Sequence, residues 1–328
     1  MNTADRADHL PKRALVTGCA GFVGSHLSER LLESGCEVVG IDCFNDNYGR
    51  TEKLRNLEAA RSWDNFDFLP LDLARGDLDD VVEGCDAVFH LAAEPGVRAS
   101  WGGRFETYVR NNVLATQLLL ESSRKSDARF VYASSSSIYG QAESYPTDEA
   151  TTPRPFSPYG VTKLAAEHLC SAYFENFGVA TSSLRFFTVY GPRQRPDMAF
   201  TRFLTALHKG DEISIYGDGH QSRDFTYVDD IVSGLVAASV SEEAIGGIFN
   251  LGGGSQVEVR EILEMMEEIT GKEARLQFLE AQAGDVRRTG ANTDRAREAL
   301  GFNPSTTLHE GISAQSAWVE STLATSSS

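Results

Sequence analysis

The chain has 328 residues, more than a single hydrophobic core usually organises, so the sequence predicts two domains or one core with a large appendage. Its formal net charge of −17 excludes nucleic-acid binding, which needs a basic face, and no apolar run reaches the roughly 18 residues of a membrane-spanning helix. We therefore expect no membrane partner, and nothing resembles a secretory signal. Five scattered cysteines without a CxxC pair indicate reduced thiols in the cytoplasm and no metal site.

Strand-like apolar runs alternate with helical patterns over the first two thirds of the chain. Several runs are apolar without alternation, as strands buried on both faces of a parallel sheet are. The alternation predicts an α/β fold with a Rossmann doubly wound parallel sheet, because it begins with a dinucleotide loop. The predicted strands are 13–18, 37–42, 66–73, 86–93, 129–135 and 181–187, and the predicted helices are 22–33, 108–124 and 159–177.

The pattern changes after residue 187 to Gly- and Pro-rich loops and short helices. A later apolar run, IFNLGG at 248–253, is typical of a strand that returns to the sheet. We therefore predict a Rossmann domain over 10–187 that reclaims about 226–251. A smaller mixed α/β C-terminal substrate domain then covers 188–225 and 252–320, and a disordered tail covers 321–328.

The first predicted strand runs into a glycine-rich turn, TGCAGFVG at 17–24. Glycine lets the backbone approach a pyrophosphate, whose charge the N-terminus of the next helix stabilises. Asp42 ends the second strand, where a carboxylate accepts from ribose hydroxyls and repels a 2′-phosphate, which favours NAD over NADP. Asp72, at the end of the third strand, is expected to reach the adenine amino group. The loop residues expected to bind the cofactor are Gly18, Gly21, Phe22, Val23 and Gly24.

The stretch SPYGVTK at 157–163 predicts that Tyr159 and Lys163 lie one helical turn apart on the same face. A tyrosine with its ordinary pKa of about 10 is a poor base at neutral pH. A neighbouring ammonium and the positive ring of an oxidised nicotinamide would stabilise the phenolate and lower that pKa. The pair follows a dinucleotide loop and a hydroxyl-rich strand end, SSSSIYG at 134–140, which favours a catalytic role over a chance surface pair.

Together these motifs resemble those of the extended short-chain dehydrogenase/reductase family of NAD-dependent epimerases and dehydratases. The resemblance covers nearly the whole chain, through TGCAGFVGSHL, LDL at 71–73, HLAA at 90–93, SSSSIYG, YGVTK and RDFTYVDD at 223–230. It implies a Rossmann fold with firmly held NAD, a sugar nucleotide in the cleft against the smaller domain, and a homodimer built on two helices of the sheet domain.

The family pattern also implies roles for individual residues. Ser135 is the catalytic hydroxyl, Tyr159 is the acid and base, and Lys163 orients the nicotinamide ribose while tuning the tyrosine. For Asn112 a structural role is nearly as well supported as a site role, and His90 is expected to be a packed structural histidine. The further residues expected to contact the cofactor are Leu73, Leu91, Ala92, Ala93, Asn112 and Ser134, together with Tyr159 and Lys163.

The two middle serines decide among the reactions of the family. Relatives that dehydrate the sugar carry an Asp-Glu pair at the positions of Ser136 and Ser137, and relatives that decarboxylate a uronic acid carry Glu at the second. Serine cannot replace a carboxylate as acid or base, so neither dehydration nor decarboxylation would have the group that carries its proton. The remaining cycle is 4-epimerisation, in which C4 is oxidised and then reduced from the other face.

The stretches RFFTVYGPRQRPDM at 185–198 and HLAAEPGVRAS at 90–100 most closely resemble those of UDP-glucuronate 4-epimerases. Thr188 occupies a position where many sugar epimerases carry Asn, and with Ser136 and Ser137 it would offer three hydroxyl donors to a C6 carboxylate. The favoured substrate is therefore UDP-glucuronate. Alternatives are a pocket for a CH2OH group, as in a UDP-glucose or UDP-N-acetylglucosamine 4-epimerase, and a non-catalytic NAD sensor, which the intact Ser135, Tyr159 and Lys163 disfavour.

Arginine suits bidentate binding of the nucleotide diphosphate, and three arginines follow the sugar motifs. Arg195 and Arg223 are the stronger candidates by resemblance, whereas Arg288 is also explained as a surface charge. Asp285, in GDVRRT, is expected to accept from the uridine ribose.

Overall fold

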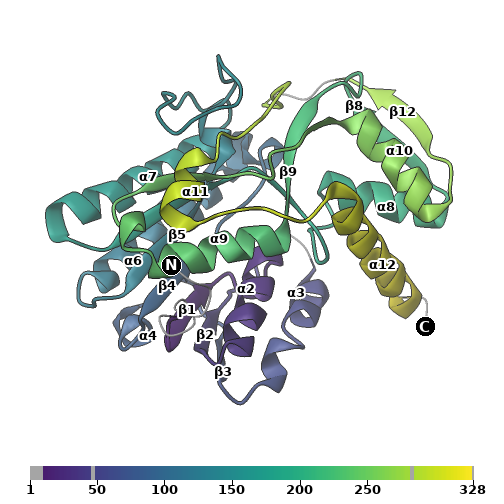
Figure 1. Ribbon diagram of the computed structural model, residues 1–328. Helices are drawn as coiled ribbons and strands as arrows, with labels where there is room; N and C mark the ends of the chain where they lie inside the picture. Colours follow the sequence, from purple (N-terminus) through teal and green to yellow (C-terminus); the bar gives the residue numbers. More distant parts are fainter. Residues whose placement is uncertain (1–9, 46–48, 281–283, 327–328) are drawn as a thin grey trace.

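The computed structural model describes residues 10–45, 49–280 and 284–326, and its centre is a seven-stranded parallel sheet (Figure 1). The strand order is β10-β6-β5-β4-β1-β2-β3, in which the first six strands of the chain follow the Rossmann arrangement. The strands of this sheet are β1 Arg13–Thr17, β2 Glu37–Ile41, β3 Phe66–Leu69, β4 Ala87–His90, β5 Arg129–Ser135, β6 Thr181–Phe186 and β10 Ile248–Leu251.

Helices cover both faces of the sheet. The packing of β1 explains why its apolar run does not alternate with polar residues. Ala14 and Val16 pack into the core on the side of α2 and α9, whereas Leu15 packs into the core on the side of α6 and α7. A strand buried on both faces is apolar throughout. The α-helices among the described residues are α2 Phe22–Glu33, α3 Arg50–Asn56, α4 Asp79–Val82, α5 Phe105–Tyr108, α6 Ala115–Ser123, α7 Pro158–Phe177, α8 Ala199–Lys209, α9 Val228–Val240, α10 Val259–Thr270, α11 Asp294–Leu300 and α12 Leu308–Ser326.

The long helix α7 has clear local signals at both ends. Ser157 caps its N-terminus by accepting a hydrogen bond from the backbone N–H of Gly160 at 3.2 Å, and Pro158 occupies the first turn. Gly178 ends the helix in the left-handed conformation, with φ of 72°. These signals fix the position of the Tyr159–Lys163 turn against the sheet.

The smaller part of the molecule has its own core. Two small sheets lie there, with β9 pairing with both β7 and β11 in one and β8 pairing with β12 in the other. Leu204, Phe225, Met266 and Ile312 come from α8, β9, α10 and α12 and share this core, at one end of the molecule in Figure 1. The predicted fold class is confirmed. The strands are β7 Thr188–Tyr190, β8 Glu212–Tyr216, β9 Ser222–Tyr227, β11 Gln256–Glu258 and β12 Arg275–Leu279.

Several local predictions differ from the structure. The strands expected over 66–73 and 86–93 end earlier, at Leu69 and His90, so Asp72 follows the third strand instead of ending it. The helix expected over 108–124 is interrupted by a wider π-helical segment, Val109–Leu114, between α5 and α6. The tail expected to be disordered from residue 321 is helical through α12, because Leu323 packs against the C-terminal core and Thr322 donates to the carbonyl of Trp318 at 2.9 Å. Residues 327 and 328 lie outside the described residues.

Candidate active site

The glycine-rich turn between β1 and α2 brings two backbone segments close together. Gly18 has φ of 72°, and a Cβ there would lie 2.9 Å from the backbone nitrogen of Ala92. A Cβ on Gly24 would lie 2.2 Å from the carbonyl oxygen of Gly18. Gly21 precedes α2 without a side-chain cap. The turn therefore forms a side-chain-free cradle at a helix N-terminus, which fits the pyrophosphate of a dinucleotide.

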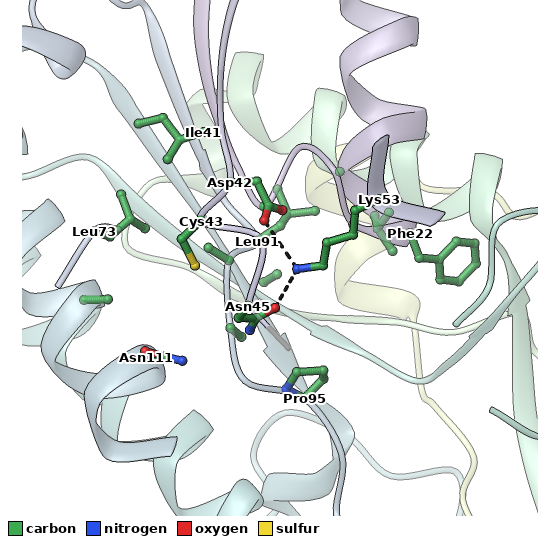
Figure 2. A pocket seen from close by; sticks show the side chains of 18 of the residues that line it. Phe22, Ile41, Asp42, Cys43, Asn45, Lys53, Leu73, Leu91, Pro95 and Asn111 are labelled. Carbon is green, nitrogen blue, oxygen red and sulfur yellow. Dashed lines mark hydrogen bonds and ion pairs between the residues drawn. The ribbon is translucent and has the colours of Figure 1, made fainter. Parts of the chain in front are cut away.

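A cavity runs from this cradle along the carboxyl ends of the sheet strands (Figure 2). It brings together all of the residues predicted for the cofactor except Asn112. The sequence analysis did not identify several other lining residues, among them Asn45, Lys53 and Asn111. The predicted residues that line the cavity are Gly18, Gly21, Phe22, Val23, Gly24, Asp42, Asp72, Leu73, Leu91, Ala92, Ala93, Ser134, Tyr159 and Lys163.

Asp42 is bound by a buried lysine that the sequence analysis missed. The Nζ of Lys53, on α3, lies 3.3 Å from Oδ1 of Asp42 and donates to Oδ1 of Asn45 at 2.5 Å (Figure 2). The Asp42 side chain is 7% exposed and that of Lys53 is 5% exposed. Lys53 therefore neutralises the carboxylate expected to bind the adenosine ribose.

Asp72 lies at the same cavity and is also held by cations. Burial raises its pKa, but the hydrogen bond from Arg110 at 2.6 Å and the charge of Arg75 outweigh burial, so the net pKa is lowered. Asp72 remains an acceptor, as contact with an adenine amino group requires.

His90 holds the strand end that faces the glycine turn. Thr17 accepts hydrogen bonds from the backbone nitrogens of Leu91 and Ala92, and its hydroxyl lies 2.8 Å from Nδ1 of His90. Nε2 of His90 lies 2.9 Å from the hydroxyl of Thr116. Burial, with the charge of Lys163, lowers the pKa of His90 to about 3. The imidazole is neutral and structural, as predicted.

The predicted catalytic residues meet at the end of β5. Tyr159 and Lys163 lie one turn apart on α7, and Tyr159 forms a side-chain hydrogen bond with Ser135. The ammonium of Lys163 lies 4.6 Å from the ring centre of Tyr132, a cation–π contact. Burial lowers the pKa of Lys163 to about 7.

The pKa of Tyr159 differs from the expectation based on its neighbours. Burial raises this pKa, and the hydrogen bond with Ser135 and the charge of Arg195 oppose the rise without reversing it. The protein's own groups therefore keep the phenol protonated, because removal from water outweighs the nearby charges.

A second cavity, which we call the sugar-side cavity, is lined by five of the seven residues predicted to bind substrate, including the two serines that follow Ser135. Ser135 accepts from the backbone nitrogen of Ser137 at 3.2 Å, which starts the 3-10 turn Ser136–Ile138. The one carboxylate among the described lining residues, Asp285, is ion-paired with Arg98 at 2.6 Å. The predicted residues that line this cavity are Ser136, Ser137, Thr188, Arg223 and Asp285.

The other two residues predicted to bind substrate do not line this cavity. Arg195 lines the first cavity and binds the Asp197 carboxylate through two contacts of 2.9 Å. Arg288 lines neither cavity; its Nε donates to the Gln256 amide oxygen at 2.9 Å, which fits the surface role.

Asn112 is buried behind the first cavity. Its amide group exchanges two hydrogen bonds with the backbone of Glu94 and donates to the hydroxyl of Thr162 at 3.0 Å. The bond to Thr162 ties the π-helical segment to α7, and the two bonds to Glu94 tie it to the loop after β4, so this geometry supports the structural alternative for Asn112.

Comparison with known proteins identifies the family. The profile of the NAD dependent epimerase/dehydratase family matches residues 14–252. The chain belongs to that family. A crystal structure of UDP-glucuronic acid 4-epimerase from Bacillus cereus, in complex with UDP-glucuronic acid and NAD, matches with a TM-score of 0.92 and 42% identity, covering 94% of this chain and 99% of that one.

Two further relatives match over nearly their whole lengths. The UDP-glucuronate 4-epimerase of Thermodesulfobacterium geofontis is 39% identical over 311 residues, 93% of this chain and 95% of that protein. An uncharacterized UDP-glucose epimerase of Bacillus subtilis is 43% identical over 311 residues, 94% of this chain and 98% of that protein. As a member of an NAD dependent epimerase/dehydratase family, this chain uses NAD as its cofactor, and the cradle at Gly18 with Asp42 fits that group.

The Lys53–Asp42 contact generates a prediction about cofactor binding. Lys53→Met leaves the Asp42 carboxylate buried without its cation, so the affinity for NAD should fall roughly tenfold, as loss of a charged hydrogen bond does. Acid extraction and chromatography should recover NAD from the purified wild type and less from the variant. Lys209→Met, at an exposed helix end, is the control. Recovery of NADP from the wild type, or equal recovery of NAD from both proteins, would contradict this assignment.

Proposed function

We propose that this protein interconverts UDP-glucuronate and UDP-galacturonate by inverting C4 of the sugar. The observation that carries the proposal is the makeup of the sugar-side cavity, which has hydroxyls at Ser136, Ser137 and Thr188. Its one described carboxylate, Asp285, is already paired with Arg98. Hydroxyl donors suit an anionic C6 group, whereas the described residues that line the cavity offer no unpaired carboxylate to eliminate water from the sugar.

Tyr159 is the proton carrier in this proposal. Its phenolate takes the proton of the C4 hydroxyl as C4 is oxidised, and its phenol returns that proton to the C4 oxygen as C4 is reduced. Ser135, hydrogen-bonded to Tyr159, aligns the C4 oxygen with the phenol. NAD, when bound, supplies the redox chemistry by accepting hydride from C4 and returning it to the opposite face, and its positive ring favours the phenolate. Each turnover therefore regenerates NAD and the tyrosine, and the sugar leaves with C4 inverted and no net change in oxidation state.

The sugar-side hydroxyls have a second task. A 4-keto uronic acid is a β-keto acid, which loses CO2 when the bond to its carboxylate lines up with the carbonyl π system. Hydrogen bonds from Ser136, Ser137 and Thr188 stabilise the carboxylate charge, which decarboxylation would disperse, and fix the rotation of the group away from that alignment. The epimerase thereby keeps its six-carbon sugar until C4 is reduced.

The nucleotide is bound at the boundary between the two cavities. Arg195 and Arg223 supply donors to the diphosphate, and Asp285 accepts from the uridine ribose in exchange for part of its contact with Arg98. Burial lowers the pKa of Arg223, while the charge of Asp285 opposes that change. Bound diphosphate would supply Arg223 with a stronger counter-charge than the carbonyl oxygens of Ser222 and Arg287, which it contacts in the protein.

The acid and base role of Tyr159 is tested by removing one oxygen. Tyr159→Phe should lower turnover roughly 100-fold or more, which is the usual loss when a general acid–base group is removed. Binding of UDP-glucuronate, measured by calorimetry, should change little. Ser135→Ala should cost less, because this hydroxyl aligns the substrate without carrying the proton. Near-normal turnover by Tyr159→Phe would show that another group moves the proton.

The choice of substrate is tested at the sugar-side hydroxyls. Ser137→Ala and Thr188→Ala should each lower turnover of UDP-glucuronate roughly tenfold, as loss of a charge-assisted hydrogen bond does, with a smaller effect on neutral UDP-sugars. The fraction of decarboxylated 4-keto-pentose product, quantified by mass spectrometry, should rise. Equal losses on charged and neutral substrates, without more pentose, would favour a neutral UDP-sugar as the substrate.

The homodimer stays a proposal, supported by an apolar surface on neighbouring helical segments. The side chains of Val109 and Leu114, in the π-helical segment, and of Val161 on α7 are 39%, 43% and 49% exposed. Large apolar side chains grouped on one face are typical of a protein interface. The cytoplasmic location also stays a prediction; all five cysteines are free thiols, and no helix among the described residues is long and apolar enough to cross a membrane.

A charged substitution tests the dimer. Leu114→Glu together with Val161→Glu should convert a dimeric wild type to a monomer in sedimentation velocity, because two charges per subunit would be buried in the interface. Phe278→Glu, at a residue on β12 that is 48% exposed, is the matched control and should leave the dimer intact. A wild type that sediments as a monomer at micromolar concentration would exclude this interface.

A further inference from the structure

The reaction described above leaves one buried pair of charges without a task. Glu167 on α7 and Arg185 on β6 lie 2.6 Å apart, and their side chains are 2% and 3% exposed. Removing two charges from water costs about as much as their attraction returns, so such a pair is weak evidence for stability, and apolar residues often serve as well. The contacts around the pair indicate what else it does.

The Glu167 carboxylate contacts the cofactor side of the site. Its Oε2 accepts a hydrogen bond from the Ser134 hydroxyl at 2.7 Å and from Nε of Arg185 at 3.1 Å, and its Oε1 accepts from Nη2 of Arg185. Ser134 lines the NAD cavity and is the residue before Ser135. The carboxylate therefore fixes the end of β5 immediately before the catalytic hydroxyl.

The Arg185 guanidinium contacts the sugar side. Its Nη1 donates to the Tyr139 hydroxyl at 2.7 Å and to the carbonyl oxygen of Glu149 at 3.2 Å. The Tyr139 hydroxyl in turn donates to the amide oxygen of Asn250, on β10, at 2.7 Å. Tyr139 directly follows the 3-10 turn Ser136–Ile138, so the guanidinium fixes the far end of the turn that carries the sugar-side serines.

Glu167 also acts on Lys163, one turn before it on α7. Burial lowers the pKa of Lys163, and the carboxylate of Glu167 opposes that change, whereas the Cys170 thiol stays protonated because burial raises its pKa. From the strands packed against this turn, Tyr132 on β5 faces the ammonium with its ring, and neutral His90 lies on β4. Of the groups that act on Lys163, Glu167 is the carboxylate.

We propose that the Glu167–Arg185 ion pair positions the catalytic site: it holds both ends of the segment from Ser134 to Tyr139 at a fixed spacing and puts a carboxylate one helical turn from Lys163. This inference rests on the proposed epimerisation. Glu167 and Arg185 are positioning residues, since they act through Ser134, Tyr139 and Lys163. Without the pair, the hydroxyls that face the cofactor and those that face the sugar would lose their common anchor.

The experiment replaces the pair without leaving a charge unpaired. Glu167→Leu combined with Arg185→Met should give a folded protein that retains NAD, because an apolar pair of similar size fills the same space. Its kcat should fall at least roughly tenfold, with KM within about twofold of wild type, because the groups that react are misaligned while the UDP site is intact. Arg129→Met with Glu242→Leu, which removes an ion pair at the opposite end of β5, is the matched control and should change neither constant.

A second variant tests the charge alone. Glu167→Gln keeps an oxygen that accepts from Ser134 but removes the charge that supports the Lys163 ammonium. The pKa of Lys163 should then fall further, so the alkaline limb of the kcat profile should move to lower pH, by about half a unit or more.

The outcomes separate this inference from the proposed function. A wild type that does not epimerise UDP-glucuronate would overturn the proposed function. The inference about the ion pair is tested separately, by the ratio of the variant kcat to the wild-type kcat on whichever UDP-sugar the wild type converts. A folded double variant with wild-type kcat, together with an unchanged pH profile for Glu167→Gln, would make the pair merely structural. Failure of both variants to fold would make it a folding element, which also overturns the proposal.

Discussion

One constraint determines where every group of the site lies: parallel strands all end at the same edge of the sheet. Thr17 ends β1 opposite Ile41 of β2 and His90 of β4, and Ser135 ends β5 opposite Phe186 of β6. The segments that follow these strands carry the glycine turn, the ribose carboxylate and the sugar-side hydroxyls. A redox site must hold a dinucleotide and a sugar in contact, and loops that converge on a rigid scaffold can do so. Ligands of open α/β sheets accordingly bind at the edge where the strands end.

The same edge is buried, and burial dominates the titration of the catalytic pair. It raises the pKa of Tyr159 and lowers that of Lys163 to about 7, so both changes favour the neutral forms. A protonated phenol beside a neutral amine carries as many protons as a phenolate beside an ammonium. In the proposed reaction, the phenolate is therefore reached by moving a proton within the site, without exchanging one with solvent. Positive charge near Tyr159 and negative charge near Lys163, as from Glu167, favour that redistribution.

Sequence patterns predicted the elements whose signals are local. The helix over 22–33 agrees with α2 at both ends, because a glycine turn and the spacing of Leu27 and Leu31 specify it. Residues that act through long-range contacts were not predicted. Lys53 resembles a surface lysine in sequence, and only the return of α3 to the cavity brings it to Asp42. Glu167 and Arg185 meet because α7 packs on β6, which no spacing rule indicates.

The carboxylates around the two cavities explain how a scaffold shared with lyases performs an isomerisation. Among the described residues that line them, the carboxylates are Asp42, Asp72 and Asp285, and each is ion-paired, with Lys53, Arg110 and Arg98 respectively. In the proposed reaction, with these carboxylates engaged by cations, proton transfer at the sugar depends on Tyr159. In that reaction a single proton carrier removes and returns the C4 hydroxyl proton but cannot also take a proton from C5, so elimination from the 4-keto sugar is closed. The sugar-side hydroxyls oppose its decarboxylation, which leaves reduction at C4.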